Sequence, residues 1–344
     1  MNLKITTSRC VRPPIARIRR MLAVTLLALI AGSPGLATAD HGEAGINELV
    51  VFGDSLSDTG NVYLATAGLA PASPQWFNGR FTNGLVWHEV LAAGMGVGPA
   101  APSLMGGKNY AWGGAEYGPG FAAGFGVPNV GTQILQFLSA NTPAADQLFV
   151  IQAGNNDFIP PGEPADPELL AQQVLEHVNT LAEAGARHFL EPSSDIRAET
   201  PGLNPPLDQA LFFGNPSQAA VADVLERRKR FNQLLRRSLV QLERQLNRDF
   251  GNVTISFLNL DLAGKVIIKQ PALFGIEEFT TPALTSFFDP LCFCEGSVAG
   301  NAEQFYFFDI VHPTATVHAV YGELARLNVS LKLRRSLRAA AEQD

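Results

Sequence analysis

Apolar residues follow two distinct spacings between residues 45 and 330. Four short runs are rich in apolar residues, at residues 49–52, 148–152, 187–190 and 253–258, and the first two are apolar at nearly every position, without the alternation of a half-buried strand. Continuous runs of this length are typical of strands that are buried on both faces of a parallel sheet. Glycine-containing turns follow the first two runs, so we expect the chain to change direction sharply there.

Longer segments between these runs have the spacing of amphipathic helices. One covers residues 167–184, with Asp166 placed to cap its first turn and Gly185 just past its end. A second covers residues 219–250, and a third follows Thr314. Strands that alternate with helices predict an α/β fold with helices on both faces of the sheet. Ligands in such folds bind beyond the carboxyl ends of the strands.

The composition is that of a well-packed globular domain. Apolar residues make up 46% of the 344 residues and charged residues 17%, a balance that excludes an intrinsically disordered chain. The formal net charge is −7, whereas nucleic-acid binding needs clustered positive charge, so no nucleic acid is expected as a partner.

The first 39 residues have the order of a secretory signal peptide. Six basic residues and no acid are followed by an apolar run from Met21 to Ala31 and then by Ala37-Thr38-Ala39. The run is shorter than the roughly 20 residues of a membrane-spanning helix. We therefore predict cleavage after Ala39 and a secreted or periplasmic protein with one domain over residues 40–344. Its charge would be −13 after loss of the six basic residues, and it would have no membrane-spanning segment.

A serine stands directly after the first predicted strand, where Ser55 follows Gly53 and Asp54. At the carboxyl end of a strand its hydroxyl is exposed at the top of the sheet. The start of a following helix would offer free backbone N–H groups to a developing oxyanion. Taken alone, such a serine is better explained as a helix N-cap.

Asp309 and His312 stand three residues apart, between an aromatic run and the third predicted helix. At this spacing the carboxylate can bond one imidazole nitrogen and leave the other free to accept a serine proton. Two further turns contain groups that can approach a substrate, at Gly113 and, after the second predicted strand, at Asn156. Ordinary tight loops and Asx turns have the same composition, so each signal is weak by itself.

These segments occur together in the order of a known family. Residues 51–61 (VFGDSLSDTGN) closely resemble the first block of the GDSL, or SGNH, lipases and esterases. The other blocks of that family are resembled, in the same order, by residues 80–84 (RFTNG), 109–115 (NYAWGGA), 154–157 (GNND) and 309–313 (DIVHP). The resemblance spans roughly residues 47–325.

The resemblance implies a serine hydrolase of carboxylic esters that needs neither a metal nor a cofactor. Ser55 would be the nucleophile, His312 the general base and Asp309 the residue that orients it. The N–H groups of Ser55 and Gly113 and the side chain of Asn156 would form the oxyanion hole. The implied fold is a flavodoxin-like, three-layer α/β/α sandwich on a five-stranded parallel sheet. The implied partner is a small-molecule or lipid ester, with transient contact to a lipid surface.

Two other functions stay open on the same fold. One is a carbohydrate O-acetylesterase, which removes acetyl groups from a polysaccharide, and the other is a catalytically silent binding protein. Eight phenylalanines between Phe274 and Phe308 are expected either to form an apolar wall for acyl chains or to fill the core.

Only two cysteines, Cys292 and Cys294, remain after the predicted cleavage. They are too few for a structural zinc site or a disulfide framework. The pair is expected to be either a strained disulfide or two thiols.

Overall fold

A computed structural model of the chain describes residues 45–159, 165–203, 216–284 and 298–341. The chain divides into two units, residues 1–39 and 40–344, and every described residue belongs to the second. The predicted signal peptide lies outside the described residues, as do Cys292 and Cys294, so cleavage after Ala39 and the redox state of the cysteines stay predictions.

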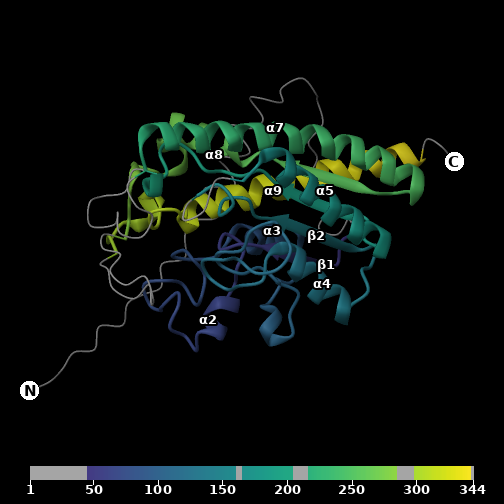
Figure 1. Cartoon of the computed structure of the whole chain (residues 1–344), viewed down its shortest axis with the longest axis horizontal. Coiled ribbons are helices and arrows are strands. Elements are labelled where there is room, and N and C mark those ends of the chain that lie inside the picture. The colour runs from purple at the N-terminus through teal and green to yellow at the C-terminus, as the bar shows by residue number, and fades with distance from the viewer. Residues whose placement is uncertain (1–44, 160–164, 204–215, 285–297, 342–344) are drawn as a thin grey trace, which may run out of the picture. The chain divides into compact units, whose positions relative to one another are not determined.

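Four parallel strands form the central sheet, in the order β1-β2-β3-β4 (Figure 1). They are β1 (Glu48–Gly53), β2 (Gln147–Gln152), β3 (His188–Pro192) and β4 (Thr254–Leu258). Nearly all of their residues are buried, as expected for strands that are covered on both faces. All four predicted strands are confirmed.

The predicted count of five strands in this sheet is wrong, although a further segment of the chain lies beside β1 at the edge of the sheet. Residues 108–112 run beside β1 in extended conformation: Val51 N–H donates to the Lys108 carbonyl (2.9 Å), and Tyr110 N–H donates to the Val51 carbonyl (2.7 Å). On its other side, the Asn109 carbonyl accepts from the Asn61 side chain and from Ser103 N–H instead of from a strand. The segment therefore closes the edge of the sheet without continuing the ladder.

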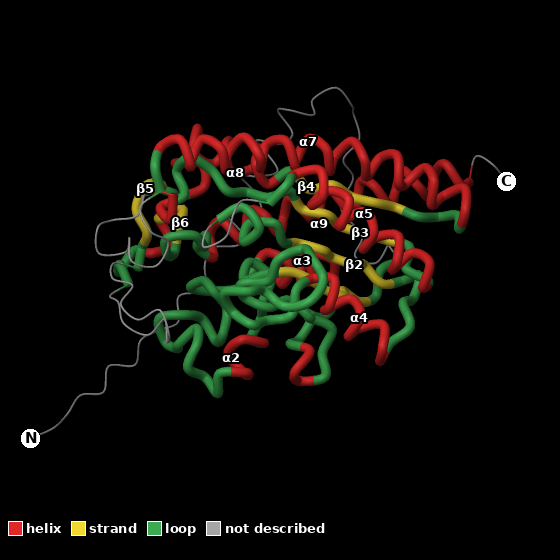
Figure 2. The backbone as a smooth tube through the Cα atoms, in the orientation of Figure 1, coloured by secondary structure: helices red, strands yellow, loops and turns green. Residues whose placement is uncertain are grey.

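Helices cover both faces of the sheet (Figure 2). One layer consists of α4 (Val130–Ala140), α5 (Pro167–Ala184) and α7 (Gln218–Asp249), and the other contains α3 (Trp87–Met95) packed on α9 (Ala315–Ala341). Alternate strand residues face the first layer, among them Val50, Phe52, Phe149, Ile151, Phe189 and Ile255. The predicted three-layer α/β/α architecture is confirmed.

The predicted ends of the helices agree closely with the structure. The Asp166 carboxylate accepts N–H donors from Glu168 and Leu169 at the start of α5, and Gly185 follows its last turn with a φ of +123°. In α7 the Ser217 hydroxyl accepts from Ala220 N–H.

The sequence did not predict α4, nor several smaller elements. They are α2 (Asn61–Ala65), α8 (Leu260–Lys269), the parallel pair β5 (Glu278–Pro282) and β6 (Phe305–Phe307), and 3₁₀ turns at Ser103–Met105, Pro201–Leu203, Pro271–Phe274 and Ala302–Gln304. None of the helices within the described ranges is long and apolar enough to cross a membrane.

Candidate active site

Ser55 lies two residues past the end of β1, at the carboxyl edge of the sheet. The chain leaves the strand through Gly53, whose φ is +155° and where a Cβ atom would lie 2.0 Å from the Gln152 carbonyl oxygen. Only glycine allows β1 and β2 to approach so closely. Sequence reasoning placed a helix start directly after Ser55, and this is wrong. A single tight turn follows, in which Asp58 N–H donates to the Asp54 carbonyl (3.0 Å), and α2 begins only at Asn61.

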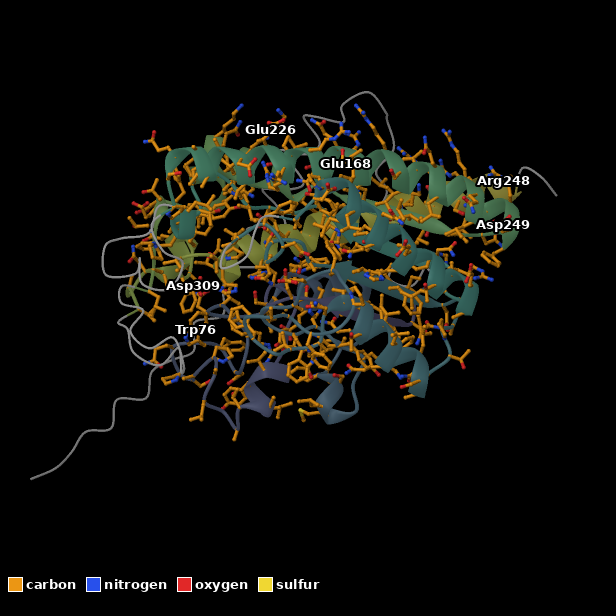
Figure 3. The ribbon with its side chains drawn as sticks, viewed as in Figure 1. Trp76, Glu168, Glu226, Arg248, Asp249 and Asp309 are labelled. Atoms are coloured by element: carbon orange, nitrogen blue, oxygen red, sulfur yellow. The ribbon has the colours of Figure 1, made fainter. Side chains whose placement is uncertain are left out.

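Asp309 and His312 lie in the loop between β6 and α9. The Asp309 Oδ1 atom accepts from the N–H groups of Val311 (2.8 Å) and His312 (2.7 Å), which fixes the turn. Its Oδ2 atom lies 2.6 Å from Nδ1 of the His312 ring. The Asp309 side chain is 2% exposed, so this hydrogen bond is shielded from water. Figure 3 labels Asp309 on this loop.

The structure brings the two predicted segments together. The Nε2 atom of His312 lies 2.7 Å from the Ser55 hydroxyl oxygen, although the residues are 257 positions apart in the chain. Since the Asp309 carboxylate can only accept, the Nδ1 atom carries the proton, and Nε2 is free to accept the proton of the hydroxyl. Ser55 itself is half-buried. This arrangement can activate a serine for attack on a carbonyl carbon.

Two aromatic rings enclose the imidazole. The Phe81 ring lies against His312 with centroids 5.2 Å apart and planes 32° apart. Trp76 meets the same imidazole edge-on at 6.2 Å, and it is labelled beside the loop in Figure 3. Trp76 also packs on Phe308 at 5.0 Å, within one buried cluster. The rings leave His312 7% exposed, so its orientation is set by packing as well as by Asp309.

The phenylalanines between Phe274 and Phe308 mostly fill the core where they can be seen. Phe274, Phe307 and Phe308 are buried, and Phe279 and Phe305 are half-buried. The other three, at positions 287, 288 and 293, lie outside the described residues.

Gly113 does not have the free N–H that the resemblance implied. Its N–H donates to Oδ2 of Asp58 at 3.1 Å, and a backbone amide has only one proton to give. The amides of Gly114 and Ser55 donate to no acceptor within the described ranges. The backbone donors available near this turn are therefore those of Ser55 and Gly114.

The side-chain amide of Asn156 uses one of its two protons in a hydrogen bond within the protein. One proton of its side-chain amide goes to the Ala115 carbonyl at 2.8 Å, which leaves the second free and links this residue to the Gly113–Gly114 turn. Asn155 faces a different neighbourhood, where its amide donates to Asp195 (2.8 Å) and its oxygen accepts from the Ser194 hydroxyl (2.7 Å).

Asp58 holds two of these segments together, and sequence reasoning missed it. Its fully buried carboxylate accepts from the N–H groups of Gly60 (2.7 Å), Asn61 (2.6 Å) and Val62 (3.2 Å) as well as Gly113. Burial raises the pKa of Asp58 to about 6, and these hydrogen bonds oppose the rise. The only sequence signal was its place within residues 51–61, the block that also contains the nucleophile candidate.

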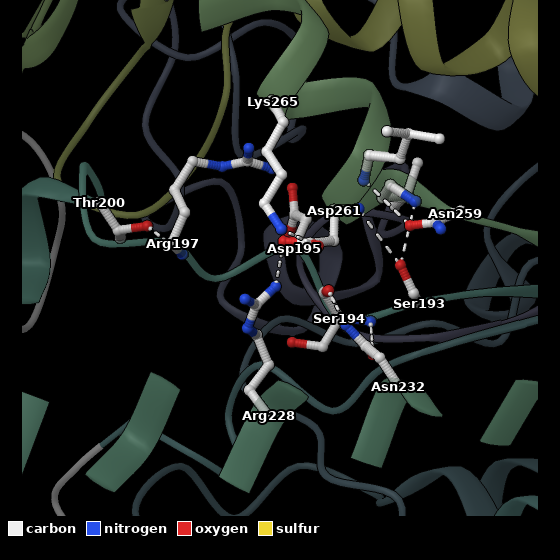
Figure 4. A network of polar contacts seen from close by, with 12 residues as sticks. Ser193, Ser194, Asp195, Arg197, Thr200, Arg228, Asn232, Asn259, Asp261 and Lys265 are labelled. Atoms are coloured by element: carbon white, nitrogen blue, oxygen red, sulfur yellow. Dashed lines mark hydrogen bonds and ion pairs between the residues drawn. The ribbon is translucent and has the colours of Figure 1, made fainter. Parts of the chain in front are cut away.

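A buried polar network joins the loop after β3 to the surrounding helices (Figure 4). The Ser193 hydroxyl accepts from Leu260 N–H at the start of α8 (3.0 Å), and Asn232 of α7 bonds both the N–H and the carbonyl of Ser194. Further along, Gly202 N–H donates to the Ile310 carbonyl at 2.6 Å. This loop therefore supports the segment that contains Asp309 and His312.

In the part of the chain that the structure describes, no group of three or more His, Cys, Asp or Glu side chains is arranged to hold an ion. His88, His177, His188 and His318, which lie outside the arrangement of Ser55, Asp309 and His312, are bonded within the protein.

Comparison with known proteins identifies the family of this chain. The profile of the GDSL-like lipase/acylhydrolase family matches residues 49–325. The thermolabile hemolysin of Vibrio parahaemolyticus is 26% identical over 290 residues, which cover 81% of this chain and 62% of the hemolysin. Phosphatidylcholine-sterol acyltransferase of Aeromonas hydrophila is 26% identical over 344 residues, which cover 88% of this chain and 95% of that enzyme.

Among solved structures, a member of the lipolytic protein G-D-S-L family from Veillonella parvula aligns over 81% of this chain and 95% of its own, with 12% identity and a TM-score of 0.37. The family assignment depends on the profile, which covers most of the sequence. The chain therefore belongs to the GDSL-like lipase/acylhydrolase family of carboxylic ester hydrolases.

Proposed function

We propose that this protein is an exported serine esterase that hydrolyses acyl esters through an acyl intermediate on Ser55. The observation that carries the proposal is the continuous hydrogen-bonded series from the Ser55 hydroxyl to His312 (2.7 Å) and on to Asp309 (2.6 Å). Export is inferred from the basic, apolar and small-residue order of residues 1–39.

In the first half of the reaction, the Ser55 oxygen attacks the ester carbonyl while Nε2 of His312 takes the hydroxyl proton. The tetrahedral intermediate then collapses as His312 returns that proton to the departing alcohol, leaving an acyl ester on Ser55. In the second half, water gives a proton to His312 and attacks the acyl carbon. The second tetrahedral intermediate then collapses as His312 returns that proton to the Ser55 oxygen, which breaks the bond to the acyl carbon, releases the acid and restores the enzyme. Asp309 stabilises the imidazolium at both stages.

The negative oxygen of each tetrahedral intermediate needs hydrogen-bond donors. We assign this role to the free N–H of Ser55, the free N–H of Gly114 and the second amide proton of Asn156. Gly114 replaces Gly113 in this assignment because the Gly113 N–H is already bonded to Asp58. The Asp58 carboxylate then acts indirectly, since it fixes the position of the glycine turn relative to the block that contains Ser55.

Labelling with a fluorophosphonate tests the nucleophile and also separates an enzyme from a silent binding protein. We expect one equivalent of label on Ser55 and none in Ser55→Ala. The matched control is Ser57→Ala in the same turn, whose hydroxyl donates to Gln152 (2.8 Å) and is not bonded to His312. Absence of label in the parent protein, or equal labelling of Ser55→Ala, would contradict the proposal.

The acyl group distinguishes a lipid esterase from a carbohydrate O-acetylesterase. We favour esters of lipid acyl chains because the relatives of this chain include a hemolysin and an enzyme named for phosphatidylcholine. Nitrophenyl esters from acetate to palmitate provide the measurement. Activity confined to acetate, together with release of acetate from an acetylated polysaccharide, would favour the carbohydrate esterase instead.

Transfer to an alcohol is a second candidate, because the relative that aligns over 95% of its own length is named an acyltransferase. A sterol or simple alcohol would then replace water in the second half of the reaction. The ratio of new ester to free acid, measured with the alcohol present, separates transfer from hydrolysis.

A further inference from the structure

A short loop beside the proposed oxyanion donors exposes two phenylalanines. Residues 119–128, which we call the phenylalanine loop, connect the segment containing Gly113 and Gly114 to α4. Phe121 is 63% exposed and Phe125 is 48% exposed. Single exposed apolar side chains are common on proteins, so this pair needs further observations before it indicates a binding surface.

The first observation is charge. No charged residue or histidine occurs from Tyr117 to Ala145, a stretch that includes the whole loop. Other exposed apolar side chains, such as Leu337 in α9, stand among arginines. The tip of the phenylalanine loop is therefore uncharged as well as apolar.

The second observation is rigidity. Phe121 and Pro128 form an antiparallel bridge, Ala122 N–H donates to the Val127 carbonyl (2.9 Å), and Asn129 N–H donates to the Gly120 carbonyl (3.0 Å). The loop is also bonded at its base, where Val130 N–H donates to the Glu116 carbonyl (2.9 Å). The backbone thus holds Phe121 outward, instead of letting it fold back onto the protein.

The third observation is position. The Phe125 ring lies directly on Gly114, where a Cβ atom would be 2.5 Å from its Cδ2 atom. The exposed face of the loop is therefore continuous with the turn that supplies the proposed Gly114 donor. A surface that covered the phenylalanines would lie at the rim of the site around Ser55.

We propose that the phenylalanine loop docks on a zwitterionic lipid surface and so delivers lipid esters to Ser55. This inference rests on the proposed function for its substrate. The chain has a net charge of −7, so electrostatic attraction to anionic lipid does not drive the contact. We therefore expect binding to depend on insertion of the phenyl rings into the lipid interface. The tip has few side-chain groups for the specific hydrogen bonds of a protein partner, whereas phenyl rings partition into a lipid interface without them.

The test is sedimentation with phosphatidylcholine vesicles, using the full chain and variants made in the same way. We expect Phe121→Asp to lower the vesicle partition coefficient about tenfold or more, because a charge replaces the phenyl ring that the proposed contact buries in the lipid. The matched control is Leu337→Asp, which alters a side chain of similar exposure (58%) near the far end of α9. It should bind vesicles like the parent protein.

A second measurement tests whether Phe121→Asp is correctly folded. Hydrolysis of nitrophenyl butyrate, a soluble ester, should be unchanged in Phe121→Asp, since Phe121 is not part of the proposed site. Phe121→Trp should be quenched by brominated phosphatidylcholine, and Leu337→Trp should not.

The outcomes separate the two proposals. No binding by the parent protein, or equal binding by Phe121→Asp, overturns the docking surface even if soluble esters are hydrolysed. A loss that is equal in Leu337→Asp also overturns it. Vesicle binding that depends on Phe121, without hydrolysis of any ester, would leave the docking surface standing and overturn the proposed function.

Discussion

The Phe81 ring contacts both His312 and the glycine turn. It lies 5.2 Å from the imidazole, and a Cβ atom at Gly113 would lie 2.4 Å from its Cζ atom. One buried side chain therefore sets the separation between the proposed general base and the turn that supplies a proposed oxyanion donor.

Phe81→Leu should impair catalysis more than substrate binding. The smaller side chain leaves His312 and the glycine turn less well positioned, and small misplacements cost about 10-fold to 100-fold in rate. We expect kcat to fall within that range while KM changes only a few-fold. Steady-state kinetics with a soluble ester provides the measurement, with near-UV circular dichroism to verify folding. An unchanged kcat would show that the ring only fills space.

Much of this arrangement could be predicted from local sequence. Asp166 and Gly185 mark the ends of α5 because capping and left-handed termination depend on adjacent residues alone. Contacts such as that between Phe81 and His312 depend on packing between distant segments, and no local pattern encodes them. The same limit explains the error at Gly113, whose N–H is occupied by an acceptor 55 positions earlier in the chain.

Asp309→Asn should retain the loop but lose most of the activity. Asparagine keeps the oxygen that accepts from Val311 and His312, yet it places an amide where the Nδ1 proton of His312 needs an acceptor. The imidazole is then held in the wrong tautomer, which in other serine hydrolases lowers kcat by about 10⁴-fold. Turnover and fluorophosphonate labelling rates should fall together. A loss below about tenfold would argue against the role given to Asp309.

Alanine substitutions at the neighbouring residues Asn155 and Asn156 should have different effects, one on stability and the other on catalysis. Asn156→Ala removes a proposed oxyanion donor, so kcat should fall by roughly 10²–10³ with little change in KM. Asn155→Ala removes the donor to Oδ1 of Asp195 and the acceptor of the Ser194 hydroxyl, so it should lower the free energy of unfolding by about 1–3 kcal/mol.

Kinetics and urea denaturation of both variants provide the comparison. If Asn155→Ala were the variant with the larger loss of kcat, the assignment of the donor would be wrong by one residue.

Asp54 should make the protein less stable as the pH rises. Burial raises its pKa from an ordinary value of 3.8 to about 7, while the hydrogen bond from Leu56 N–H and the nearby His312 oppose the rise. Because the folded state holds this proton longer than the unfolded state, folding binds protons between about pH 4 and 7. Stability from this group is therefore full below pH 4 and is lost as the pH rises through about 7.

Asp54→Asn has no carboxyl group to ionise at this position. The difference in free energy of unfolding between this variant and the parent protein should therefore shift in favour of the variant by on the order of 2 kcal/mol from pH 5 to pH 8. Urea denaturation at both pH values measures the difference. Asp249→Asn, at an exposed position labelled in Figure 3, is the control and should follow the parent. If Asp54→Asn kept the pH dependence of the parent, another group would be responsible for it.

The separation of 257 positions between Ser55 and His312 also affects when the site can form during synthesis. A ribosome adds on the order of 5–20 residues per second, and the loop that contains His312 is made after nearly all of the sheet. Until that loop reaches the end of β1, the serine has no base beside it. In the proposed mechanism, an incomplete chain that lacks this base therefore has no activated nucleophile, and the appearance of activity marks the moment at which the first and last parts of the fold have met.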